Sequence, residues 1–150
     1  MPKVSITSNS VEETMAIAAK FAKNLKAGDI VFLQGDLGAG KTVFTKGLAK
    51  ALKVEESAVV SPTFILMNYY EGKLPIYHFD LYRLEKTEEL RSVQFDEYFY
   101  GEGLSIIEWP ERLGALAPQE YWLVELSHVN ESERNICISY PSKPQHKISL

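Results

Sequence analysis

One loop constrains this chain more than any other feature, because it follows a short apolar run and matches a phosphate-binding pattern at every fixed position. Residues 35–42 read Gly-Asp-Leu-Gly-Ala-Gly-Lys-Thr, which is G-x-x-x-x-G-K-T, and residues 30–33 before them are all apolar. Glycines allow a tight turn with inward-pointing backbone N–H groups, and the helix expected after the loop adds its positive N-terminal end. This arrangement predicts binding of nucleoside triphosphate phosphates. The loop residues expected at the phosphates are Gly35, Asp36, Leu37, Gly38, Ala39, Gly40, Lys41 and Thr42.

Two side chains of this P-loop have separate expected roles. Lys41 is expected to reach the β- and γ-phosphates, which makes it a candidate catalytic residue. Thr42 is expected to offer its hydroxyl to the Mg²⁺ ion that bridges those phosphates.

Length and composition favour one globular domain. The chain has 150 residues, of which 45% are hydrophobic and 24% charged, so it can bury a core but is too short for two ordinary domains. We expect a P-loop ATPase domain over residues 1–140 and a loose tail over residues 141–150, which contain two prolines. The net charge of −4 argues against a broad basic footprint for nucleic acid. Any RNA contact is therefore expected to be local or made through a partner.

Cysteine usage and hydropathy favour a reducing compartment. Cys137 is the single cysteine of the chain, so no internal disulfide can form. It stands between Ile136 and Ile138, where packing within a strand is expected rather than nucleophilic chemistry. The N-terminal residues contain no apolar segment of signal-peptide length, and no run approaches the length of a membrane span. We expect a soluble, cytoplasmic protein.

Hydrophobic periodicity predicts the α/β class: a single P-loop NTPase domain with a mixed, mostly parallel central sheet, flanking helices and an antiparallel hairpin. Ser10 and Glu13 offer a capping box for a helix that ends near Gly28, with a buried stripe of Met15, Ala18, Ala19 and Ala22. Residues 71–73 are a connection short enough for a hairpin. The expected strands are residues 4–7, 30–33, 64–70, 75–80, 104–108, 121–127 and 135–140, and the other expected helices are residues 41–52 and 87–100.

Two acidic residues end predicted strands where a P-loop protein needs a carboxylate for magnesium. Asp80 ends one strand and Glu108 ends another, and carboxyl ends of parallel strands meet at the ligand-binding edge of such sheets. Either acid could hold the metal while the other orients water. The alternative is that each acid caps the following helix or pairs with Arg83 or Arg112.

Three further positions are candidates with open alternatives. Thr63, in Ser-Pro-Thr-Phe at 61–64, occupies the place where nucleotide switches sense the γ-phosphate, although Ser-Pro-Thr is also a common turn. Trp109 follows Glu108 and is expected either near the nucleotide, at a docking surface or in the core. His78 has no second His or Cys at metal-ligand spacing, so we expect a hydrogen-bonded core or surface histidine. No guanine-reading [NT]-K-x-D pattern is present, which favours ATP over GTP.

Taken together, these segments resemble the TsaE family, also called YjeE. The resemblance extends from the first predicted helix to about residue 113, and beyond it only the strand pattern agrees. It implies a small bacterial ATPase needed for threonylcarbamoyladenosine, a modification beside the anticodon of tRNAs that read codons beginning with A. In that family a TsaC-type enzyme makes the carbamoyl-adenylate, TsaD with TsaB transfers it to tRNA, and TsaE binds that pair and hydrolyses ATP to sustain turnover. The segments that carry the resemblance are Gly-Asp-Leu-Gly-Ala-Gly-Lys-Thr at 35–42, Ser-Pro-Thr-Phe at 61–64, His-Phe-Asp-Leu-Tyr-Arg-Leu at 78–84 and Glu-Trp-Pro-Glu at 108–111.

The resemblance also implies roles for individual residues. Thr42 and Glu108 bind Mg²⁺, Asp80 serves the network of magnesium and water, and Trp109 lies beside the site. Val43 stands where many relatives have a second threonine, so only its backbone N–H can contact the α-phosphate. Two further contacts are implied on poorer matching, one from residues 8–12 to the adenine end and one from Arg134 to the phosphates.

Two other functions share the P-loop. A small-molecule kinase would need an acceptor pocket and usually an arginine-bearing lid, and no arginine-rich segment is present. A nucleotide-dependent interaction switch would use Thr63 and Asp80 to couple the γ-phosphate to a docking surface. The switch tolerates slow hydrolysis, whereas the ATPase requires it.

Overall fold

The computed structural model describes residues 2–36, 38–55, 58–59, 67–84, 95–99 and 101–141. Predicted elements or sites that fall elsewhere in the chain lie outside the described residues. The elements within these ranges are β1 (Lys3–Ser8), α1 (Val11–Ala22), β2 (Ile30–Gln34), α2 (Lys41–Ala51), β3 (Met67–Tyr70), β4 (Ile76–Asp80), α3 (Phe95–Phe99), β5 (Leu104–Glu108), the 3-10 helix η3 (Pro110–Leu116), β6 (Trp122–His128) and β7 (Arg134–Ser139).

The strands form one seven-stranded sheet in the order β1-β7-β6-β2-β5-β4-β3. Its four middle strands, β6, β2, β5 and β4, are parallel. The pairs at both edges are antiparallel, and one of them is the predicted hairpin, in which Tyr70 pairs with Ile76. The predicted α/β fold, with a mixed sheet and an antiparallel hairpin, is confirmed.

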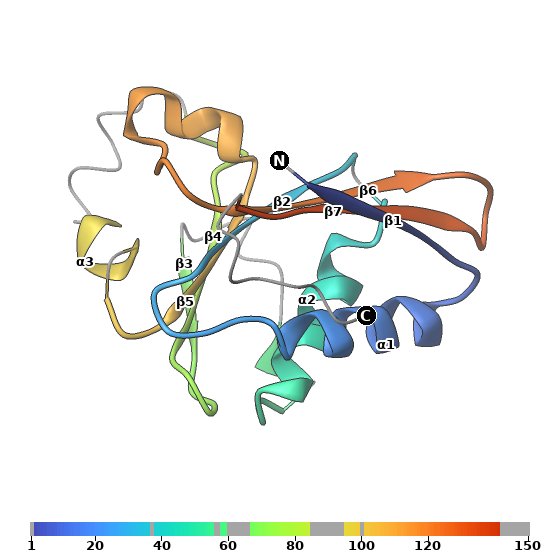
Figure 1. The fold of residues 1–150 in the computed structure, drawn as a ribbon, viewed down its shortest axis with the longest axis horizontal. Helices are drawn as coiled ribbons and strands as arrows, with labels where there is room; N and C mark the ends of the chain where they lie inside the picture. The colour runs from blue at the N-terminus through green and yellow to red at the C-terminus, as the bar shows by residue number, and fades with distance from the viewer. Residues whose placement is uncertain are drawn as a thin grey trace.

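The middle strands are continuously apolar because both of their faces are covered (Figure 1). On β2, Val31 and Leu33 face α1 and α2, whereas Ile30 and Phe32 belong to a second core beside α3 and η3. All four side chains are buried. The molecule is therefore three layers, with the sheet between helices, and residues at the ends of its middle strands reach the surface only at the sheet edge.

The helices α1 and α2 pack closely because a glycine stands at their contact. A Cβ atom added to Gly47 of α2 would lie 2.6 Å from the carbonyl oxygen and 2.7 Å from the Cα of Met15 on α1. Real Cβ atoms do not approach backbone atoms so closely, so only glycine fits here without moving a helix. This contact fixes α2, and with it the helix end that follows the P-loop.

The predicted end of the first helix is wrong by about one and a half turns. Helix α1 ends at Ala22 rather than near Gly28, because the side-chain amide of Asn24 donates to the carbonyl oxygens of Lys20 and Phe21 at 3.2 Å. The buried stripe also differs. Ala18 and Ala22 are buried as predicted, but Thr14 and Phe21 are buried in place of Met15 and Ala19, since the Phe21 ring packs edge-on against Trp122 at 5.3 Å.

Several predictions fall partly outside the described residues. The predicted helix over 87–100 is described only as α3, and residues 64–66 of the predicted hairpin strand and most of the predicted tail are not described. Cys137 is a half-buried free thiol in β7. None of the helices in the described part of the chain is long and apolar enough to cross a membrane.

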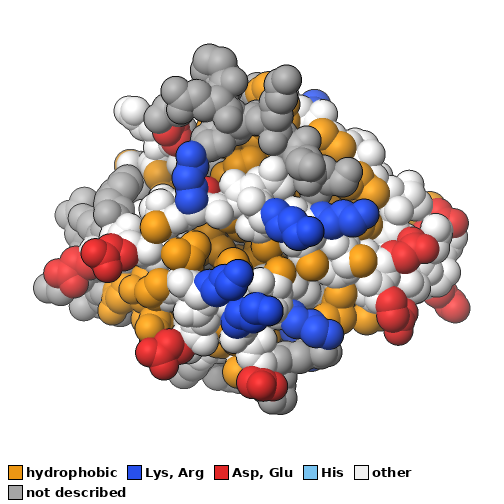
Figure 2. Space-filling model, turned by 60° about the horizontal axis from the view of Figure 1, so that its bottom comes forward, with side chains coloured by type: hydrophobic (Ala, Val, Ile, Leu, Met, Phe, Trp, Pro, Cys, Tyr) orange, Lys and Arg blue, Asp and Glu red, His pale blue; other side chains and the backbone are white. Residues whose placement is uncertain are grey.

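Charge is distributed unevenly over the surface. Figure 2 shows lysine and arginine side chains gathered over the face formed by α1 and α2, with acidic side chains around its rim. The exposed lysines of these helices and of the residues just after them are Lys20, Lys23, Lys50 and Lys53, which we call the lysine face.

Candidate nucleotide and metal site

The P-loop joins the end of β2 to the first turn of α2. Gly40 is the N-cap of α2, and its φ of 104° places it in the left-handed region that side-chain-bearing residues rarely adopt. No side chain caps this end of the helix. The first N–H groups of an α-helix have no partner within the helix, so the backbone here offers donors and a positive dipole end to an anion.

Both predicted acids lie at this end of the sheet. Asp80 and Glu108 stand opposite each other in the parallel ladder of β4 and β5, and they are 7% and 3% exposed. The Lys41 Nζ lies 3.9 Å from the Glu108 Oε1. The Asp80 Oδ1 also accepts the backbone N–H of Tyr82 at 2.9 Å, so the alternative role of Asp80, capping the next turn, is present beside its place in the site.

His78 is buried and hydrogen-bonded, as one of the sequence alternatives predicted, but its partner was not predicted. Its Nε2 lies 2.6 Å from the Glu108 Oε2, and its Nδ1 lies 3.0 Å from the hydroxyl oxygen of Tyr70. The usable signal was the spacing of His78 two residues before Asp80, because alternate residues of a strand share a face. Tyr70 had no signal of its own, since its place depends on the register of the hairpin.

Trp109 lies beside the P-loop rather than in the interior of either core. Its ring centroid is 4.6 Å from the Lys41 Nζ and 4.9 Å from the ring of Tyr82. The residue has φ 59° and ψ 52°, a left-handed conformation that costs a bulky residue about 1 kcal/mol or more and is found mainly where function requires it. A cavity of about 280 Å³ opens here, lined by Leu33, Gln34, Gly35, Asp36, Lys41, Trp109 and Glu111.

A second cavity of about 360 Å³ lies on the other side of the loop. The two segments expected near the nucleotide, residues 8–12 and Arg134, both contribute to it, and an Nη2 of Arg134 donates to the Gly38 carbonyl oxygen at 3.5 Å. The Ser10 Oγ accepts the Glu13 N–H at 3.0 Å, which fixes the turn at the wall of the cavity. The lining residues are Asn9, Ser10, Val11, Thr14, Gly38, Gly40, Val43, Glu131, Ser132 and Arg134.

The comparisons with known proteins agree with this geometry. A family model described as "Threonylcarbamoyl adenosine biosynthesis protein TsaE" matches residues 8–136. The chain belongs to the TsaE family. It is 44% identical to the tRNA threonylcarbamoyladenosine biosynthesis protein TsaE of Bacillus subtilis over 126 residues, which cover 83% of this chain and 78% of that protein. It is 37% identical to the protein of the same name from Treponema pallidum, with 88% of this chain and 97% of that protein covered.

A solved structure has the same architecture. The crystal structure of Bacillus subtilis YdiB superposes with a TM-score of 0.77 and 35% sequence identity, covering 93% of this chain and 86% of that one. The chain is therefore similar to known proteins in its fold as well as in its sequence. The family model, which matches residues 8–136, also includes β6 and the start of β7, beyond the motifs that carried the sequence resemblance.

Two predicted site residues of this TsaE-family chain cannot be placed. Leu37 of the P-loop and the switch candidate Thr63 lie outside the described residues. The other predicted residues are described, and Thr42 and Val43 are half-buried in the first turn of α2. Across the described ranges, no group of three or more His, Cys, Asp and Glu residues could hold a metal ion.

Proposed function

We propose that this TsaE-family chain takes part in tRNA threonylcarbamoyladenosine biosynthesis as a Mg²⁺-dependent ATPase that supports the TsaB–TsaD pair. One observation carries the enzymatic part: Lys41 at the start of α2 lies 3.9 Å from Glu108, which stands opposite Asp80 at the carboxyl edge of the sheet. A cation, two buried carboxylates and an uncapped helix N-terminus at one point match the needs of a metal-bound triphosphate.

The residues present fit MgATP. The P-loop from Gly35 to Thr42 is placed to bind the phosphates, with the Val43 N–H beside it, and the Thr42 hydroxyl, Glu108 and Asp80 supply the oxygen ligands that Mg²⁺ prefers. Magnesium keeps several waters and is usually shared with substrate phosphates, so it does not require a cluster of protein ligands. When bound, the ion neutralises the charge that develops on the transferred phosphoryl group.

The chain's own residues then have separate tasks. Lys41 stabilises charge on the terminal phosphates, and the ring of Trp109 packs against its ammonium group and covers the cavity beside it. Whichever of Asp80 and Glu108 does not bind the ion directly is placed to hold a water molecule by hydrogen bonding. The cavity that residues 8–12 and Arg134 line is the proposed place for the adenine end.

The partners follow from the family role. Hydrolysis is proposed to be weak in the isolated chain and stimulated by TsaB–TsaD, because charge-stabilising groups often arrive with a partner. With a net charge of −4, the chain is proposed to reach tRNA indirectly, through that complex, in the cytoplasm.

The test is Mg²⁺-dependent ATP hydrolysis by the purified chain, alone and with the TsaB–TsaD pair and tRNA. Lys41→Ala is the blank, and Lys50→Ala is the matched control because Lys50 is an exposed lysine of the same helix. We expect stimulation in wild type and Lys50→Ala and at least a tenfold loss in Lys41→Ala, the scale that loss of one charge-stabilising group has in other enzymes. ATP binding without stimulation would refute the partnership.

A second comparison separates the ATPase from the nucleotide-dependent switch. Asp80→Asn and Glu108→Gln keep side-chain volume while removing a carboxylate. If hydrolysis is required, both variants bind ATP but fail to sustain tRNA modification over many turnovers. Full modification activity in either variant, with hydrolysis lost, would instead establish the switch.

A further inference from the structure

A line of polar side chains, half-buried at Asn68 and buried beyond it, crosses three neighbouring strands and ends at Glu108. From β3, the Asn68 amide nitrogen lies 3.5 Å from the Tyr70 hydroxyl oxygen. That oxygen lies 3.0 Å from the His78 Nδ1 on β4, and the His78 Nε2 lies 2.6 Å from the Glu108 Oε2 on β5. Tyr70, His78 and Glu108 are 5%, 0% and 3% exposed, so the two contacts among these three side chains are shielded from water.

The chemistry of the groups gives this line a direction. An ionised carboxylate can only accept hydrogen bonds, so the His78 Nε2 donates to Glu108. The tautomer that is protonated on Nε2 alone leaves Nδ1 as an acceptor for the Tyr70 hydroxyl, whose oxygen accepts from the Asn68 amide nitrogen. In this tautomer every hydrogen bond is donated in the direction of Glu108.

The far oxygen of Glu108 shows what this arrangement does. Its Oε1 lies 3.9 Å from the Lys41 Nζ, which is longer than the 2.7–2.9 Å typical of a charge-assisted hydrogen bond. The 2.6 Å contact with the His78 Nε2 anchors the other oxygen of the same carboxylate, Oε2.

We propose that Tyr70 and His78 are positioning residues: they fix the Glu108 carboxylate so that Lys41 stays available to nucleotide phosphates and Oε1 stays available to the metal. The inference rests on the proposed function of the site. Partners of a metal-binding carboxylate commonly change metal affinity by 10- to 100-fold when removed. Here the loss of the Tyr70 or His78 contact would also free the Glu108 carboxylate to pair with Lys41. Glu108 would then compete with the nucleotide phosphates for this lysine.

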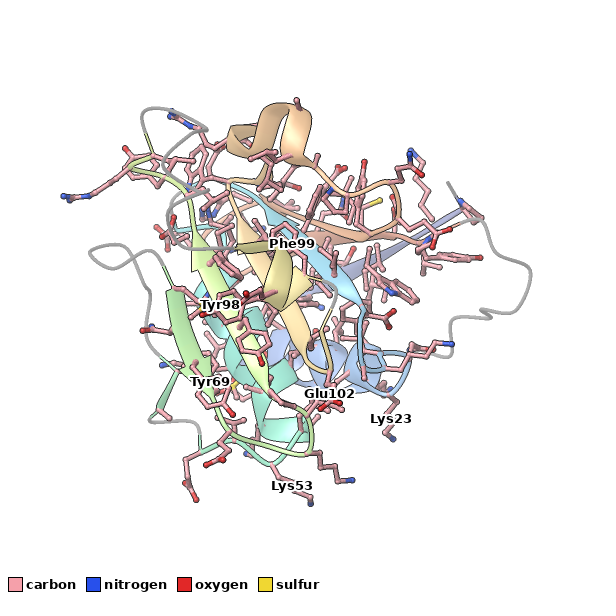
Figure 3. The ribbon with its side chains drawn as sticks, turned by 90° about the vertical axis from the view of Figure 1, so that its left-hand side faces the viewer. Lys23, Lys53, Tyr69, Tyr98, Phe99 and Glu102 are labelled. Atoms are coloured by element: carbon pink, nitrogen blue, oxygen red, sulfur yellow. The ribbon has the colours of Figure 1, made fainter. Side chains whose placement is uncertain are left out.

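The hairpin supplies a matched control. Tyr69 is next to Tyr70 but lies on the other face of the strand, with its ring 5.6 Å from that of Tyr77. Figure 3 shows Tyr69 on the side of the hairpin where Tyr98 lies, and Tyr98 also packs on Tyr77. Tyr69→Phe and Tyr70→Phe are thus the same chemical change at adjacent positions, and only one of them touches the line to Glu108.

The first measurement needs no nucleotide. Long-range ¹H–¹⁵N NMR of the free wild-type protein reports which His78 nitrogen carries the proton. We expect a proton on Nε2, the nitrogen that faces Glu108. An Nε2 without a proton would leave no donor to the carboxylate and would overturn the proposal.

The second measurement is calorimetric binding of ADP with and without Mg²⁺, which gives the factor by which Mg²⁺ strengthens binding. We expect this factor to fall roughly 10-fold or more in His78→Leu, and to fall in Tyr70→Phe. It should recover in part in His78→Gln, which keeps a donor, and stay at the wild-type value in Tyr69→Phe.

The outcomes separate this proposal from the proposed function. Wild-type Mg²⁺-dependent ADP binding with an unchanged factor in Tyr70→Phe and His78→Gln would overturn the positioning role alone, leaving a purely structural network. No ADP binding by the wild type would refute the nucleotide site and the inference together. Tyr70→Phe keeps the test decisive if His78→Leu does not fold.

Discussion

Replacing Gly47 with alanine tests how the P-loop helix is held, because two effects of opposite sign compete. In an isolated helix the change would stabilise by about 1 kcal/mol, since glycine is the poorer helix former. In this structure the new Cβ would meet the Met15 carbonyl oxygen at 2.6 Å, the Met15 Cα at 2.7 Å and the Ala18 Cβ at 3.0 Å. The nearest two are backbone atoms, so no side-chain rotation can relieve the contact.

The balance favours destabilisation. Ordinary carbon contacts begin near 3.5 Å, so the two helices must separate by roughly 0.5–1 Å along their contact. Overpacking a tight interior typically costs about 1–3 kcal/mol. Set against the helix-propensity gain of about 1 kcal/mol, this gives a net loss of up to about 2 kcal/mol in the free energy of unfolding, and a fall in Tm of up to roughly 8 °C for a domain of this size.

The assay is urea unfolding followed by circular dichroism at 222 nm, compared at equal m values. Lys50→Ala on the same helix is the control, and as an exposed substitution it should stay within about 0.5 kcal/mol of wild type. A Gly47→Ala variant more stable than wild type would refute the reasoning, because helix propensity would then outweigh the close contact with Met15.

Two further outcomes follow from aromatic residues. Trp109 borders the cavity beside Lys41, whereas Trp122 is buried in the core. Binding of ADP should therefore change the intrinsic fluorescence of wild type but not that of Trp109→Phe. A fluorescence change that persists in the variant would place the nucleotide elsewhere. Burial is the largest cause that raises the pKa of Tyr77 above 10.0, and the neighbouring Tyr69, Tyr98 and Glu102 raise it further. As the pH rises above about 10, the unfolded chain therefore loses this proton more readily than the folded one, and the stability of the fold decreases. The urea midpoint of each protein is measured at about pH 9 and about pH 10.5. The decrease between the two pH values should be smaller for Tyr77→Phe than for wild type, and equal decreases would contradict the stated cause.

Local patterns in the sequence were sufficient for most of the fold. The continuous apolar run in β2 predicted a strand covered on both faces, and the short connection at residues 71–73 predicted the hairpin. The end of α1 could not be predicted in this way, because it depends on the side-chain amide of Asn24 donating back to the carbonyl oxygens of Lys20 and Phe21 in the last turn. Thr14 was missed for a similar reason: its hydroxyl is buried against that of Ser8 at 2.7 Å.

The residues of the site likewise fall into those that local sequence patterns predicted and those that depend on contacts between strands. Asp80 and Glu108 were predictable because each ends a strand, and parallel strands deliver their carboxyl ends to one edge. Tyr70 was not, because its contact with His78 depends on the pairing of β3 with β4 rather than on any motif. The sequence left several locations open for Trp109. Its ring lies beside Lys41 on a residue with a left-handed backbone, and no sequence pattern predicts that conformation.

The lysine face gives this acidic chain an electric dipole. Helix α1 carries Glu12 and Glu13 in its first turn and Lys20 in its last, and the lysines on and after α2 lie on the same side. A charged partner approaching the molecule would therefore rotate it before contact, although the net charge alone would predict uniform repulsion of anions. Added salt should weaken this orientation, because mobile ions screen exposed charges over about 8 Å at physiological ionic strength.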